Sequence, residues 1–243
     1  DEADRMLDMG FGAEVEKILR ALPKTRQTSF FSATFPPSIA TMSRNWQRNP
    51  VFVQIGDVEA TDSTTRQIAY AVSAEGRGAA LCTVLRSHAP SSALVFCNFK
   101  TSVRAVTSML VAEGFAADAL HGDLDQRDRD LVMAKFRNGS IRVLVATDVA
   151  ARGLDIDGLA AVVQYEFAGK ADTATHRFGR TGRAGAVGLA IALITPADAD
   201  KVHAFTLAAR AAKANATFER LPLPTFSTGP TAAVAAAAAA APT

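Results

Sequence analysis

Residues 93–114, ALVFCNFKTSVRAVTSMLVAEG, decide the fold class. They begin with a continuous apolar run from Ala93 to Cys97, which is typical of a strand buried on both faces of a sheet. A helical period follows from Thr101 to Glu113, and Gly114 is a common residue just beyond a helix end. Because a buried strand followed directly by a helix is half of a strand–helix–strand unit, we expect a parallel sheet covered by helices.

The same alternation continues in both directions along the chain. We expect further strands at residues 27–33, 51–55, 67–73, 143–146, 161–163 and 189–194. Helices are expected at 36–48, 77–88, 125–137 and 197–213, with Leu131, Val132 and Phe136 facing inward on the third of these. The predicted fold class is α/β, and in such sheets ligands bind beyond the carboxyl ends of the strands.

Composition limits the class of protein further. The chain has 243 residues, of which 49% are hydrophobic and 21% charged, and this balance indicates a globular protein with a core. The net charge of +2 does not by itself indicate a nucleic-acid ligand. Cys82 and Cys97 lie in apolar patterns and are expected to be core residues in a reducing, cytoplasmic setting. No apolar run reaches the roughly 18 residues that span a bilayer, so no membrane partner is expected.

Hydrophobic periodicity is lost at residues 56–66, GDVEATDSTTR, which indicates a linker. We therefore predict a first domain segment over 1–56, a linker over 57–66, a second domain over 67–222 and an Ala-rich, low-complexity tail over 223–243.

Short polar motifs follow or flank the predicted strands. They are DEAD at 1–4, SAT at 32–34, HGD at 121–123, ATDVAARGLDI at 146–156 and HRFGRTGR at 176–183. Two have ordinary structural interpretations: residues 32–34 can cap the helix that follows Pro36, and Gln126 with Arg129 can form a solvated helical face. The last two motifs favour function, because charged residues are rarely buried without a partner and arginines pair well with phosphate oxygens.

Taken together and in this order, these motifs resemble those of the DEAD-box ATP-dependent RNA helicases. DEAD, SAT, ATDVAARGLDI and HRFGRTGR match motifs II, III, V and VI of the family, residues 96–100 fall at motif IV, and Gln126 with Arg129 match its QxxR element. The resemblance extends from residue 1 to about residue 222, and the stretches LHGDLDQRDRD and NGSIRVLVATDVAARGLDI are most similar to the bacterial DbpA-type subgroup. It implies two RecA-like domains, of which this chain would carry the C-terminal part of the first and all of the second.

The resemblance also implies roles for individual residues at the nucleotide. Asp1 would hold Mg²⁺ through water, and Glu2 would activate the attacking water. From the second domain, Asp155 would contact the ribose of ATP. Arg180 and Arg183 would reach the γ-phosphate, with Arg183 as the arginine finger.

A second set of roles concerns RNA and the coupling of the two sites. The resemblance implies that the RNA backbone is contacted by Gln126, Arg129 and Thr147. It implies coupling roles for Asp4, Ser32, Thr34 and His176. The arginines at 129, 177, 180 and 183 would concentrate basic charge where the acidic ligands lie.

The chain departs from the family pattern at several places. Phe99 stands where motif IV usually has Thr, so a hydroxyl contact is lost there. The segment 168–175, AGKADTAT, lacks the family's usual Pro-containing, acidic and aromatic pattern. No GxxxxGK[ST] sequence occurs in the 243 residues, so we expect the chain alone to be inactive as an ATPase.

Three functions remain open from the sequence. The first is an ATP-dependent RNA helicase that unwinds short duplexes in ribosome assembly, with ribosomal RNA or pre-ribosomal particles as partners. The second is a non-catalytic RNA-binding or clamp module, which the absent P-loop and Phe99 favour. The third is a DNA helicase of the same superfamily. Trp46 is expected to be a helix-packing residue in each case.

Overall fold

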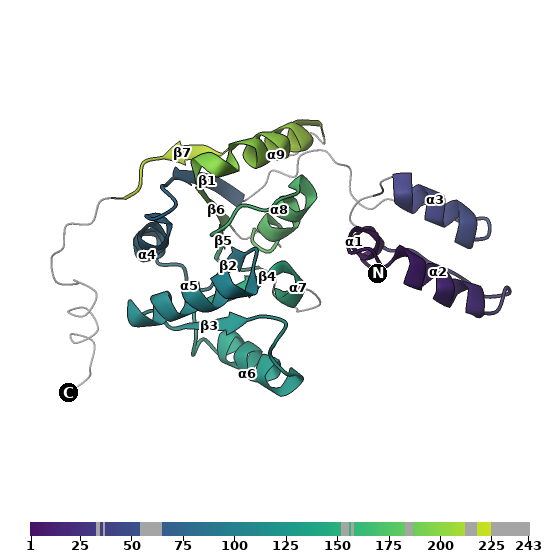
Figure 1. Ribbon diagram of the computed structural model, residues 1–243, viewed down its shortest axis with the longest axis horizontal. Helices are drawn as coiled ribbons and strands as arrows, with labels where there is room; N and C mark the ends of the chain where they lie inside the picture. Colours follow the sequence, from purple (N-terminus) through teal and green to yellow (C-terminus); the bar gives the residue numbers. More distant parts are fainter. Residues whose placement is uncertain are drawn as a thin grey trace. The chain divides into compact units, whose positions relative to one another are not determined.

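The computed structural model divides the chain into two compact units, Asp1–Asp57 and Val58–Thr243, which are considered one at a time (Figure 1). It describes residues 1–32, 35, 37–53, 65–151, 156, 158–182, 187–211 and 218–224. Of the predicted site residues, Thr34, Asp155 and Arg183 lie outside the described residues, as do most of the predicted linker and the Ala-rich tail.

The first unit contains three helices, α1 (Ala3–Asp8), α2 (Gly12–Ala21) and α3 (Pro37–Trp46). The predicted strands at 27–33 and 51–55 are not formed by their described residues. A strand needs a neighbour for its ladder of hydrogen bonds, and no described residue pairs with either segment as a strand. Val51 and Val53 are 85% and 72% exposed, so the β-rich composition there is not matched by burial.

The second unit is built on a seven-stranded parallel sheet, which confirms the predicted α/β class. Its strands are β1 (Thr65–Ala71), β2 (Ala93–Cys97), β3 (Ala117–Leu120), β4 (Val143–Thr147), β5 (Ala161–Gln164), β6 (Gly188–Ile194) and β7 (Glu219–Leu221). They lie in the order β3-β4-β2-β5-β6-β1-β7. Strand β1 begins at Thr65, two residues before the predicted start of this strand at residue 67.

Helices cover both faces of this sheet (Figure 1). On one face lie α4 (Arg77–His88) and α5 (Lys100–Ala112). On the other lie α6 (Gln126–Arg137), α7 (Asp148–Ala151), α8 (Ala171–Phe178) and α9 (Ala199–Ala211). Strand β2 shows why both faces are apolar: Leu94 and Phe96 point into one core, and Val95 points into the other. No helix in the described ranges is long and apolar enough to cross a membrane.

Two helical details differ from the sequence prediction. Leu131 is 53% exposed and Met133 is buried in its place, because Val132, Met133 and Phe136 share one face of α6. Helix α8 is not among the helices predicted from the sequence. It is held by its last residue, Phe178, whose ring packs edge-to-face on Phe205 at a centroid distance of 5.7 Å.

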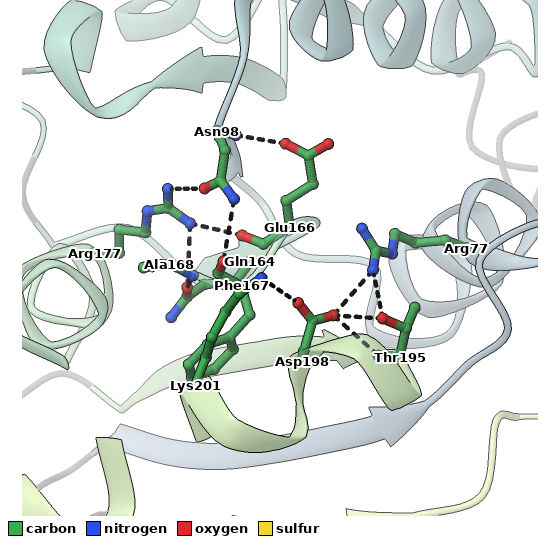
Figure 2. A network of polar contacts seen from close by, with 10 residues as sticks. All are labelled: Arg77, Asn98, Gln164, Glu166, Phe167, Ala168, Arg177, Thr195, Asp198 and Lys201. Carbon is green, nitrogen blue, oxygen red and sulfur yellow. Dashed lines mark hydrogen bonds and ion pairs between the residues drawn. The ribbon is translucent and has the colours of Figure 1, made fainter. Parts of the chain in front are cut away.

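A buried ion pair ties the start of α4 to the segment between β6 and α9 (Figure 2). Arg77 lies 3.0 Å from Asp198, which closes the short 3₁₀ turn Pro196–Asp198 and also accepts from the Thr195 hydroxyl at 2.7 Å. Burial works to raise the pKa of Asp198, but hydrogen bonds from Thr195 and Lys201 outweigh it and hold that pKa below its ordinary value.

This lowered pKa makes stability depend on pH in the acid range. Because the unfolded chain binds the proton more readily, Asp198 stabilises the folded state above about pH 4 and loses that contribution as the pH falls further. We expect Asp198→Asn to reduce the free energy of unfolding at neutral pH and to flatten its decline below about pH 4. Urea unfolding from pH 3 to pH 7 measures this, with exposed Asp200→Asn as the control. Parallel pH curves for Asp198→Asn and the unaltered chain would contradict it.

Candidate functional site

The carboxyl edge of the sheet is organised around the side chain of Arg177 in α8, which is only 2% exposed (Figure 2). Its Nε and one terminal nitrogen donate to the two carboxylate oxygens of Asp148 at 2.8 and 2.7 Å. Asp148 directly follows β4, so this pair joins the end of that strand to α8. A paired fork of this kind is the strongest form of arginine–carboxylate contact.

The remaining donors of Arg177 reach two other strand ends. One terminal nitrogen donates to the Glu166 carbonyl at 2.7 Å and to Gln164 Oε1 at 3.2 Å, just beyond and at the end of β5. The other also donates to Asn98 Oδ1 at 2.7 Å, just beyond β2. The guanidinium lies over the ring of Phe96, 5.1 Å from its centroid. All five N–H donors are therefore used inside the protein.

This arrangement corrects one expectation from the sequence. Arg177 was grouped with the arginines that meet acidic ligands, but its charge is buried and satisfied by Asp148. Asp148 in turn has a structural partner, which explains an acidic residue at this position without a ligand. The motif gave no means of telling which of its arginines would be internal.

Arg177 lies between two of the predicted site residues. His176 precedes it in α8, and Arg180 follows two residues after the helix ends at Phe178. Both are partly buried. The backbone N–H of Arg180 donates to the Arg177 carbonyl at 3.3 Å, so the position of Arg180 depends on the buried arginine.

Two of the residues predicted to touch RNA converge on the backbone of a single residue, Ala150. Arg129 donates to the carbonyl of Ala150 at 3.2 Å, and the Thr147 hydroxyl accepts from the N–H of Ala150 at 3.4 Å. Thr147 is 8% exposed. Gln126 is exposed and donates to Asp130 at 2.8 Å, so it lies on the surface of α6 and not in this cluster.

A second charged cluster lies beside α5 and was not predicted. Asp123 accepts from Lys100 at 2.6 Å and from Arg104 at 3.0 Å. The hydrogen bond from Lys100 lowers the pKa of Asp123. His121 is buried behind it, and its Nδ1 accepts from the N–H of Asp123 at 3.3 Å. Basic residues four apart at the start of a helix were the signal that could have found this cluster.

Phe99 is an unusual residue at the N-terminal cap position of α5. Its ring is 65% exposed, and as the residue before α5 it provides no side-chain hydrogen bond to the open N–H groups of the first turn. The hydroxyl that motif IV usually places here is therefore replaced by an exposed aromatic surface.

The first unit brings two further motifs together. The backbone N–H of Asp4 donates to Ser32 Oγ at 3.1 Å, and that of Ala3 donates to the Phe31 carbonyl at 3.0 Å. Asp4 is 7% exposed. Asp1 accepts from the N–H of Glu2 at 2.8 Å, and Glu2 has a left-handed φ of 49°. DEAD and the first residue of SAT thus lie in contact, whereas the functional roles of these residues stay predictions.

Family models match both units. The model described as "DEAD/DEAH box helicase" matches residues 1–42, and the one described as "Helicase conserved C-terminal domain" matches residues 76–185. Among curated proteins, the ATP-dependent RNA helicase DbpA of Escherichia coli is 48% identical over 203 residues, which cover 84% of this chain and 44% of DbpA. DbpA of Bacillus subtilis is 43% identical over 198 residues, or 80% of this chain and 41% of that protein.

Solved structures of DEAD-box proteins are also similar to this chain. Dbp5 of S. cerevisiae bound to RNA and ADP BeF3 superimposes with a TM-score of 0.79 at 29% identity, covering 92% of this chain and 58% of that one. A DEAD box protein of Methanococcus jannaschii gives 0.59 at 36% identity, with the same coverages of 92% and 58%. The fold and the edge of its sheet define a RecA-like helicase domain. The chain belongs to the DEAD-box family of RNA helicases, and it spans less than half the length of the DbpA proteins that it matches.

The buried pair gives a direct test of the site's construction. We expect Asp148→Ala to lower the free energy of unfolding by about 3 kcal/mol, because it leaves the Arg177 charge buried without its carboxylate. Urea unfolding followed by circular dichroism measures this. Asp130→Ala, at an exposed acidic residue of α6, is the control and should change stability by less than about 0.5 kcal/mol. Equal midpoints for the two variants would show that the pair does not hold the edge together.

Proposed function

We propose that this chain forms part of an ATP-dependent RNA helicase, in which ATP binding and hydrolysis drive local unwinding of RNA duplexes. The Asp148–Arg177 pair is the observation that carries the proposal. Thr147, predicted to touch RNA, directly precedes Asp148. His176, predicted to couple the two sites, directly precedes Arg177, and Arg180, predicted to reach the γ-phosphate, follows three residues later. A shift of the RNA-side residues is therefore transmitted to the nucleotide side through a rigid buried contact.

The nucleotide chemistry in this proposal follows phosphoryl transfer. Glu2 orients the attacking water, while Arg180 and Arg183 neutralise charge on the γ-phosphate. Mg²⁺ is commonly held by one or two carboxylates together with waters and phosphate oxygens, and the Asp1 carboxylate is a donor of that kind. No group of three His, Cys, Asp or Glu side chains that could hold a metal occurs among the described residues, so the phosphates would complete the ion's shell.

On the RNA side, Arg129 and Thr147 place a guanidinium and a hydroxyl beside the backbone of Ala150. Such groups contact phosphates and sugars and do not distinguish bases, so binding by this edge would be independent of sequence. From the DbpA-type resemblance we extend the proposal to ribosomal RNA or pre-ribosomal particles as targets in the cytoplasm.

The central test is RNA-stimulated ATP hydrolysis by a polypeptide that joins this chain to a P-loop domain. We expect Glu2→Gln and Arg183→Ala each to reduce turnover strongly, Arg183→Ala by roughly 10³-fold or more. Lys17→Gln, at an exposed residue of α2, is the control and should leave turnover unchanged. For the 243-residue chain alone we expect no measurable turnover, because its sequence contains no GxxxxGK[ST] to cradle the phosphates.

A non-catalytic RNA clamp is the second candidate, favoured by the exposed ring of Phe99 in place of the motif IV hydroxyl. The same experiment separates the two. Turnover that does not respond to RNA, or that is insensitive to Glu2→Gln, would reject the helicase. RNA binding with no turnover at all would support the clamp.

A further inference from the structure

Charge is distributed unevenly along the first unit. Residues 17–53 contain six basic residues and no Asp or Glu: Lys17, Arg20, Lys24, Arg26, Arg44 and Arg48. The acidic residues of this unit's described part all lie within residues 1–16. A stretch this long that carries only positive charges favours an anionic ligand. The net charge of the whole chain does not reveal this stretch, because acidic residues elsewhere balance it.

Four of these cations surround one pocket. It has a volume of about 530 Å³ and lies between the C-terminal ends of α2 and α3, which run side by side in Figure 1. Its lining includes Arg20, Lys24, Arg26 and Arg48 together with the ring of Trp46. A cavity of this size can enclose a ligand as large as a nucleotide.

Two of the lining cations, Arg26 and Arg48, are held in place by uncharged acceptors. Arg26 donates to the Pro23 carbonyl and to Thr28 Oγ1, both at 3.1 Å, and Arg48 donates to the Lys24 carbonyl at 3.1 Å. These acceptors are uncharged. In the part of the chain that the structure describes, Arg20 is the lining cation that pairs with a carboxylate, that of Glu16 at 2.9 Å.

Trp46 adds an aromatic surface to this basic pocket. It is partly exposed, and the Arg20 guanidinium lies 5.9 Å from the centroid of its ring. A helix-packing role, as expected from the sequence, accounts for the buried part of the indole. It does not account for the four cations that line the same pocket as the indole.

We propose that this pocket binds single-stranded RNA, with phosphates on the four cations and an unpaired base stacked against Trp46. Basic grooves with an aromatic platform are the usual means of holding a single strand. An acidic protein segment would use the cations but would gain little from the indole. The inference shares its ligand with the proposed function, but the site is separate: it uses no residue of DEAD, SAT or the sheet edge.

Trp46 itself is the probe, because it is the single tryptophan of the chain. Titration of the 243-residue chain with a single-stranded oligouridine should quench its fluorescence. We expect Lys24→Glu to weaken the binding that causes this quench by about tenfold and to reduce the slope of log K against log salt by about 1. Lys17→Glu has the same charge change on α2 but lies outside the pocket lining, and it should weaken binding much less.

The outcomes separate this site from the one at the sheet edge. Arg129→Ala should leave the Trp46 quench intact, even where it lowers total RNA binding measured by anisotropy. If RNA binds but Trp46 fluorescence does not change, or if Lys24→Glu and Lys17→Glu act alike, the pocket is not an RNA site. A quench by oligoglutamate as strong as that by RNA would overturn the proposal in favour of an acidic protein partner.

Discussion

The buried guanidinium of Arg177 is the interaction on which the functional edge depends. A charge removed from water is costly unless it is paired and fully hydrogen-bonded, and all five of its donors have partners. Those partners come from β2, β4 and β5, which are neighbours in the sheet. The requirement to satisfy one side chain therefore fixes the relative positions of three loops.

The elements joined by this side chain lie next to residues on which the proposed chemistry relies. Helix α7 begins at Asp148, directly after Thr147 at the end of β4, while α8 carries His176 and positions Arg180. The buried Asp148–Arg177 pair holds the end of β4 firmly against α8. Such a contact suits an enzyme in which RNA binding and nucleotide binding must influence each other. Exposed ion pairs such as Lys100–Asp123 contribute much less to stability individually.

Much of this fold could be predicted because buried helices and strands have hydrophobic residues at regular spacings in the sequence. The bounds of α4 and β2 match the prediction at both ends, since each has a clear apolar pattern. The segment at 27–33 has the same composition as a strand, yet strand formation depends on a neighbour that composition does not reveal. For the same reason the sequence placed Arg177 among the ligand-binding arginines: the motif records three arginines, and only packing shows which one is internal.

Amide hydrogen exchange in Arg177→Lys tests the central claim most directly. Lysine keeps the positive charge but cannot reproduce the five-donor fork. We expect faster exchange in α8 and in the residues just after β2 and β4, with α4 and β1 unchanged. Unchanged protection of α8, or a uniform increase across the whole sheet, would contradict the claim that this guanidinium holds the edge together.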